Sequence, residues 1–151
     1  MVSVVDLFTL RDVYRARVVV QRHLIRTPLR YSRRLSRLLG FNVYLKLENA
    51  QVTGSFKVRG GVYFMSVKAD EAVRRGVVTA STGNHAQSIA YAASLFGAKA
   101  TIVVPHGISR VKVEALRDLG ADVIFHAPSS KRLGSMLRGL LLRRACSTST
   151  P

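Results

Sequence analysis

Three short apolar runs in the second half of the chain limit the folds it can adopt more than any other feature. They are Val77–Ala80, Ala100–Pro105 and Ala121–Phe125, and each has the length of a buried strand. Helical segments separate them, the first ending near Phe96 and the second beginning after Ser109. Strands that alternate with helices in this way predict a parallel sheet with helices on both faces, a three-layer α/β fold.

The first half of the chain predicts two helices and a strand. Asp6–His23 has apolar residues at helical spacing, and Thr9 can cap this helix. Ser32–Leu39 predicts a second helix, which Gly40 ends. Asn42–Leu47 alternates in polarity and is expected to be a strand. The residues of the second helix that we expect to face inward are Leu35, Leu38 and Leu39.

A lysine stands at the centre of the stretch Gln51–Gly61, QVTGSFKVRGG. Ser55 can cap a helix that runs from Lys57 to about Arg75, which would put the lysine in its first turn and partly bury it. A lysine in such a position can carry an aldehyde cofactor on its amine. For these residues taken alone, a surface lysine at a helix start is the commoner case.

A second stretch of interest is Ser81–Gln87, STGNHAQ, where a strand is expected to turn into a helix. Unpaired N–H groups at the start of a helix favour an anion, and Gly83 allows a ligand to approach the backbone closely. The hydroxyls and the amide of this turn suit a carboxylate. By itself, the pattern is more typical of an ordinary capped turn. Among the histidines, we expect a functional role only for His85.

Together these stretches resemble one enzyme family. KLENAQVTGSFKVRGG is similar to the cofactor-lysine motif of the fold-type II pyridoxal-phosphate enzymes, specifically the threonine and serine dehydratases and serine racemase. STGNHAQ resembles the loop that binds the substrate carboxylate in that family. DVYRARVVVQRHLIRTPLRYSRRLSRLLG resembles its N-terminal segment. Because the motifs occur in family order, chance similarity is a poor explanation.

The resemblance implies a role for each matching residue. Lys57 would form the Schiff base with pyridoxal 5'-phosphate, with Phe56 beside it, and Asn84 would contact the phenolic oxygen of the cofactor. The residues expected to bind the substrate carboxylate are Ser81, Thr82, Asn84 and His85. Thr82 also stands where racemases place a second acid/base group, so it is a catalytic candidate with Lys57. Its methyl group and restricted rotamers favour elimination over racemisation.

The activity implied is that of a threonine/serine ammonia-lyase, which converts L-threonine to 2-oxobutanoate and ammonia. A serine racemase or a threonine-synthase-like enzyme would share both motifs. A non-catalytic basic binding module is an alternative of another class, and a fragment that a second polypeptide completes is a further one. The resemblance also implies a homo-oligomer for the full-length family.

Composition argues against several other classes of protein and site. The net charge is +16, from 24 Lys and Arg against 8 Asp and Glu, but the basic residues are spread over most segments. We therefore expect no specific nucleic-acid binding. The single cysteine, Cys146, excludes an internal disulfide framework, and no histidine pair has the context of metal ligands. No apolar run approaches membrane-spanning length, so a cytoplasmic protein is the default expectation.

The chain changes character at residue 127. Residues 127–151 contain five Lys and Arg and no acidic residue, and they end in a run rich in Ser and Thr. We expect residues 1–126 to be the N-terminal part of a dehydratase catalytic domain and 127–151 to be a basic, non-homologous tail, from a shifted frame or a truncated gene. Leu133–Leu142 could form a basic amphipathic helix. The only adjacent glycines are Gly60 and Gly61, so the glycine-rich phosphate loop of the family is absent and little activity is expected.

Overall fold

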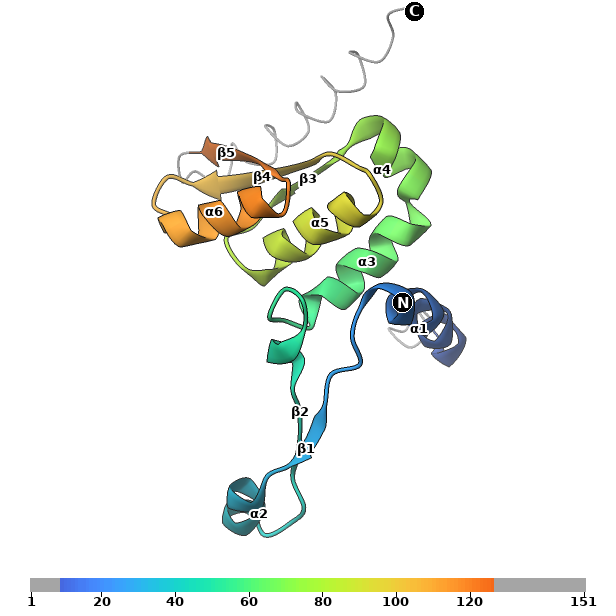
Figure 1. The fold of residues 1–151 in the computed structure, drawn as a ribbon, viewed down its shortest axis with the longest axis vertical. Helices are drawn as coiled ribbons and strands as arrows, with labels where there is room; N and C mark the ends of the chain where they lie inside the picture. Colours follow the sequence, from blue (N-terminus) through green and yellow to red (C-terminus); the bar gives the residue numbers. More distant parts are fainter. Residues whose placement is uncertain (1–8, 127–151) are drawn as a thin grey trace, which may run out of the picture. The chain divides into compact units, whose positions relative to one another are not determined.

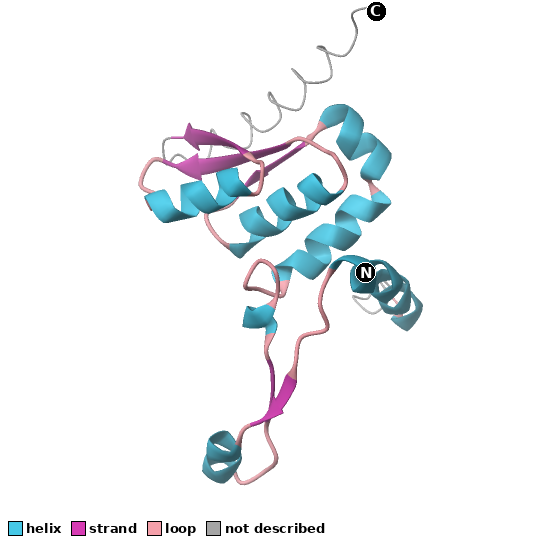
Figure 2. Ribbon diagram, viewed as in Figure 1, coloured by secondary structure: helices cyan, strands magenta, loops and turns pink. Residues whose placement is uncertain are grey.

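The computed structural model describes residues 9–126 of the chain. The chain divides between Phe56 and Lys57 into two compact units. The first contains helices and a two-stranded ribbon, and the second contains helices and a three-stranded sheet (Figure 2). Within residues 9–126, no helix is both long and apolar enough to cross a bilayer. The boundary at residue 127 and the helix expected at Leu133–Leu142 lie outside the described residues.

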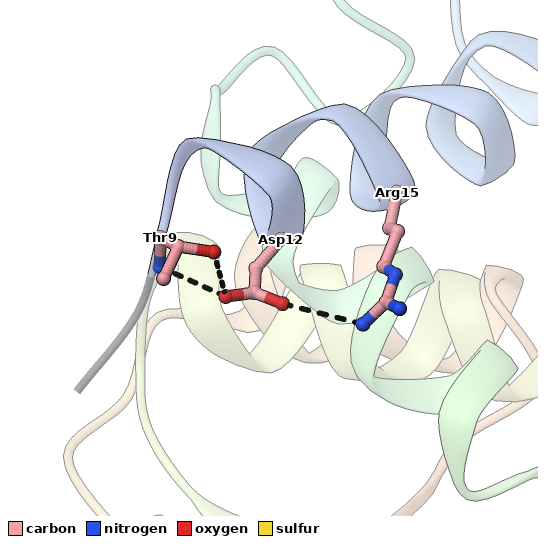
Figure 3. A network of polar contacts seen from close by, with 3 residues as sticks. All are labelled: Thr9, Asp12 and Arg15. Atoms are coloured by element: carbon pink, nitrogen blue, oxygen red, sulfur yellow. Dashed lines mark hydrogen bonds and ion pairs between the residues drawn. The ribbon is translucent and has the colours of Figure 1, made fainter. Parts of the chain in front are cut away.

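Helix α1, Leu10–His23, begins at a small network of polar side chains (Figure 3). Asp12 Oδ2 accepts hydrogen bonds from the backbone N–H of Thr9 at 2.8 Å and from its hydroxyl at 2.7 Å. The guanidinium of Arg15 lies 3.6 Å from Asp12 Oδ1. The hydroxyl bond and then the N–H bond from Thr9 are the main causes that lower the pKa of Asp12. Thr9 is thus confirmed as the N-cap.

A two-stranded antiparallel ribbon follows α1. It pairs β1, Leu29–Tyr31, with β2, Tyr44–Lys46. The sequence pattern does not predict β1, which has only three residues, whereas β2 lies inside the predicted strand 42–47. The helix between the strands has the predicted signals at both ends: Ser32 is its N-cap, and Gly40 ends it with a φ of 77°.

This connecting helix, α2, spans Arg33–Leu39 and buries a serine instead of its leucines. Ser36 is 8% exposed, and its Oγ accepts a hydrogen bond from the N–H of Val43 at 2.9 Å. Leu38 is 77% exposed and Leu39 51%, so the prediction that they face inward is wrong. The physical reason is the helical turn of 3.6 residues. Leu38 comes two positions after the buried Ser36 and therefore projects to the opposite side of the helix.

The loop before Lys57 is anchored by a buried glutamine. Gln51 is 4% exposed, and it follows the short 3-10 helix η2, Glu48–Ala50. Its amide donates to the carbonyl of Ile25 at 2.9 Å and accepts the N–H of Ile25 at 3.3 Å. A single side chain thus satisfies both backbone groups of a residue far away in sequence. Within the first unit, Gln51 ties the loop that leads to the lysine to the segment after α1.

The second unit is built on a parallel sheet of order β3-β4-β5 (Figure 1). Its strands are β3, Val77–Ala80, β4, Ala100–Pro105, and β5, Asp122–His126. The central strand β4 is buried at its first five positions, as expected for the interior of a parallel sheet. The α/β fold with a parallel sheet and helices, predicted from the alternating apolar runs, is confirmed.

Helices α5, Asn84–Leu95, and α6, Arg110–Asp118, connect the three strands. Both crossovers step in the same direction along the sheet, so the right-handed rule places both helices on one face. Figure 1 shows them along the same side of the sheet, and α5 contacts β3 and β4 while α6 contacts β5. Helix α5 begins shortly after the carboxyl end of β3.

Two helices precede β3 where one is predicted. They are α3, Lys57–Val67, and α4, Ala69–Arg75, and the interruption at Lys68 corrects the prediction of a continuous helix to Arg75. The first turn of α4 has acidic residues and its last turn has arginines, which is the favourable arrangement for a separate helix dipole. The helix α3 starts at Lys57, two residues after the predicted cap Ser55, so the lysine does lie in the first turn.

Helix α3 packs closely against α5, and a glycine makes this possible (Figure 1). A Cβ atom on Gly61 would lie 2.3 Å from Ser88 Oγ and 2.8 Å from the Ser88 carbonyl oxygen. The neighbouring Gly60 has nothing within 4 Å of such an atom. Val58, Val62 and Met65 of α3 have no exposed surface, so the contact contributes an apolar core to the second unit.

The two adjacent glycines of α3 should respond oppositely to alanine. Gly61→Ala should lower the free energy of unfolding by about 1–3 kcal/mol, because the new methyl group overlaps Ser88. Gly60→Ala should raise it by up to about 1 kcal/mol, because alanine favours a helix and meets no obstacle. Urea unfolding of both variants checks this. Equal effects of the two substitutions would contradict the close packing of α3 on α5.

The cap of α1 should depend on pH. The pKa of Asp12 is lower in the folded chain than in the unfolded chain, so the unfolded chain binds a proton on this carboxylate first as the pH falls. The stabilisation that the carboxylate gives to the folded chain is therefore lost as the pH falls through the folded pKa. The difference in helicity between the wild type and Asp12→Asn, measured by circular dichroism, should be present near neutral pH and shrink toward zero in acid. A difference independent of pH would show that the carboxylate charge plays no part.

Candidate functional site

The second unit contains a cavity of about 670 Å³ between α3, α4, β3 and the start of α5. Small-molecule sites commonly have volumes of roughly 300–1,000 Å³. Its lining combines apolar residues with a few charged residues. The lining residues are Lys57, Gly60, Gly61, Phe64, Lys68, Glu71, Ala72, Arg75, Gly76, Val77, Val78, Thr79, His85 and Ile89.

Lys57, the first residue of α3, lines this cavity. Its side chain is exposed, which corrects the expectation of partial burial. Its backbone is held inside the protein, since the buried hydroxyl of Ser88 donates to the Lys57 carbonyl at 2.7 Å. The side chain of Lys57 is thus exposed, while the carbonyl at the start of the helix is fixed.

The turn between β3 and α5 brings the second predicted stretch to the same unit. Gly83 is the N-cap of α5, and its carbonyl accepts the N–H of Ala86 at 3.0 Å. Within residues 9–126, the backbone N–H groups of Asn84 and His85 donate to no backbone carbonyl. Donors in the first turn of a helix favour an anion.

The structure brings some of the predicted residues to the cavity and leaves others outside it. Lys57 and His85, one from each motif, both line it. Thr82 and Asn84 are exposed on the turn and are not part of the lining. Ser81 is half-buried, and its Oγ accepts the N–H of Gly83 at 3.3 Å, so this hydroxyl shapes the turn itself.

Phe56 belongs to the first unit, in which its side chain is 58% exposed. The role in cofactor binding that the motif implies for it stays a prediction. No group of three His, Cys, Asp or Glu side chains within the described residues could hold a metal ion.

The sequence did not predict that a group of charged residues lines the cavity. Lys68 and Arg75 lie 3.7 Å and 3.5 Å from carboxylate oxygens of Glu71, and all three line the cavity. Their i,i+3 and i,i+4 spacing predicts ion pairs on a helix surface but gives no indication of a cavity beside them. The apolar wall residues Phe64 and Ile89 were likewise not predicted, since helical periodicity does not separate a core position from a cavity position.

Comparison with known proteins agrees with both motifs. Residues 20–147 match the model of the family described as pyridoxal-phosphate dependent enzyme. The L-threonine ammonia-lyase of Thermotoga maritima is 46% identical over 118 residues, which are 78% of this chain and 29% of the relative. The chain thus spans less than a third of the length of that relative.

Solved structures show the same fold. The serine racemase of Dictyostelium discoideum matches with a TM-score of 0.85 and 32% identity, over 91% of this chain and 45% of that chain. Threonine deaminase isoform 2 of Solanum lycopersicum matches with a TM-score of 0.70 and 35% identity, over 81% of this chain and 35% of that chain.

Proposed function

Because the chain belongs to the family of pyridoxal-phosphate-dependent enzymes, we propose that it is the lysine-bearing N-terminal part of a threonine/serine ammonia-lyase. The observation that carries this proposal is that Lys57 and His85, from two separate motifs, line one cavity. The 46% identity to an L-threonine ammonia-lyase supports the choice of reaction. The reaction would convert L-threonine to 2-oxobutanoate and ammonia.

The described residues fit the aldehyde end of pyridoxal phosphate. An exposed amine at the edge of a cavity with apolar walls, formed by residues such as Phe64, Val77 and Ile89, can accept an aromatic aldehyde. When bound, the cofactor supplies an electron-accepting ring that stabilises negative charge on the α-carbon of the substrate. The paired glycines Gly60 and Gly61 lie inside α3, so they cannot form a loop around the phosphate.

We assign the roles as follows. The Lys57 amine would hold the cofactor through its aldehyde and would accept the α-proton of the substrate. The N–H groups of Asn84 and His85, with the hydroxyls of Ser81 and Thr82, bind the substrate carboxylate, because helix dipole and donors act on the same anion there. The Asn84 amide would contact the phenolic oxygen of the cofactor. Thr82 is the candidate second acid/base group, and the cofactor role that the motif implies for Phe56 stays a prediction.

The chain alone is proposed to have little activity. Within residues 9–126, the paired glycines belong to a helix and offer the phosphate no nest of backbone N–H groups, which would weaken both binding and orientation of the cofactor. Homo-oligomeric assembly, a cytoplasmic location and the absence of specific nucleic-acid binding stay predictions, as does the division at residue 127.

A racemase is the second candidate, since a serine racemase has a similar fold. The two activities differ at Thr82, where a racemase needs a second proton donor on the face opposite the lysine. The methyl group and restricted rotamers of threonine favour elimination. For a full-length enzyme that carries these residues, 2-oxobutanoate from L-threonine would support the lyase, and the D-amino acid would support the racemase.

Cofactor capture should require Lys57. Pyridoxal phosphate added to the wild type should produce the absorption band of a lysine-linked aldehyde, and Lys57→Ala should abolish it. Lys68→Ala is the matched control, because it removes another amine from the lining of the same cavity and should leave the band in place. A band that persists in Lys57→Ala, or that is lost only in Lys68→Ala, would contradict the assignment.

Carboxylate binding should depend on the turn before α5. With the cofactor loaded, Thr82→Val should raise the L-threonine concentration needed for the half-maximal spectral change about tenfold or more, because it removes a hydroxyl that donates to the charged carboxylate and keeps the branched shape of the side chain. Ser94→Ala, on the exposed side of the same helix, should leave this concentration unchanged. Equal values for both variants would show that the Thr82 hydroxyl does not bind the carboxylate.

A further inference from the structure

We infer that Ser88 is a positioning residue for Lys57, an inference that rests on the proposed role of this lysine. The Ser88 hydroxyl holds the Lys57 carbonyl and so fixes the first turn of α3 against α5. Neither of the two motifs includes Ser88, which follows the second one directly.

The hydrogen bond crosses between two helices. Ser88 has no exposed surface, and its Oγ donates to the Lys57 carbonyl at 2.7 Å. A serine inside a helix usually directs its hydroxyl to the carbonyl four residues earlier, which here is that of Asn84. Ser88 instead reaches a residue 31 positions away in the sequence. A buried hydroxyl without a partner is costly, so this bond is strongly favoured once the helices pack.

Gly61 gives the second point of contact. A Cβ on Gly61 would meet the Ser88 side-chain oxygen at 2.3 Å and its carbonyl oxygen at 2.8 Å, so the backbone of α3 lies directly on Ser88. Lys57 and Gly61 are one helical turn apart. One serine therefore fixes both ends of the turn that carries the amine, by a hydrogen bond at one end and by close packing at the other.

The same helix presents His85 to the cavity. His85 and Ser88 are three residues apart on α5 and therefore lie on neighbouring positions of one helix face. One residue lines the cavity with Lys57, and the other holds the Lys57 backbone. The position of the lysine relative to the carboxylate turn is thereby fixed through α5. Reaction rates are sensitive to displacements of about 1 Å, so a loose first turn would reduce the selectivity of Lys57 for the aldehyde.

The test is the selectivity of aldehyde capture, with pyridoxal phosphate itself as the probe. The wild type and variants are incubated with it, reduced with borohydride and digested, and the label on Lys57 relative to exposed Lys99 is measured by mass spectrometry. Ser88→Ala should lower this ratio about fivefold, the effect of one hydrogen bond of about 1 kcal/mol. Ser66→Ala is the control, since it removes a serine hydroxyl that donates to the Tyr63 carbonyl at 2.7 Å within α3, and it should leave the ratio unchanged.

A second variant keeps the test decisive if Ser88→Ala folds poorly. Ser88→Cys nearly preserves the volume and has a weaker donor, so it should lower the ratio by a smaller factor. A wild-type ratio in the folded Ser88 variants, with only their thermal stability lowered, would show a purely structural role and overturn the inference. A wild type that labels Lys57 no more than Lys99 would overturn the proposed function, and the inference with it.

Discussion

The close packing of α3 on α5 is the contact on which the arrangement of the second unit depends. It needs a residue without a side chain at Gly61 and a small buried donor at Ser88, which the chain provides at matching positions. Around this point α3 buries Val58, Val62 and Met65 completely. Apolar burial supplies most of the stability of such a contact, while the hydrogen bond and the missing Cβ determine its register.

The candidate site follows from this packing. Since α5 begins at the carboxyl end of β3, its N-terminus lies where ligands bind in open α/β sheets. Since α3 lies against α5, the lysine at its first position reaches the same cavity as His85. Two short motifs that are separate in the sequence thus each contribute a residue to the lining of one cavity. The chemistry that we propose combines the amine of Lys57 with the anion-binding donors of the turn before α5.

Much of this was predictable from the sequence. Strand and helix order from Val77 to His126 follows from apolar run length and glycine positions, because these local signals agree with the final fold. The position of Lys57 and His85 at one cavity agrees with the motif resemblance, whereas the chemistry assigned to Lys57 and to the turn before α5 stays a prediction. What the sequence could not give depends on contacts between distant segments: the three-residue β1, the interruption at Lys68, the exposure of Leu38, and the bond from Ser88.

The bond proposed between Lys57 and the cofactor can be observed directly. A crystal structure of the chain with pyridoxal phosphate should show continuous electron density from the Nζ of Lys57 to the aldehyde carbon, with the ring beside the cavity that His85 lines. Density that joins the cofactor to another lysine, or a Lys57 side chain that carries nothing while the cofactor binds elsewhere, would contradict the account.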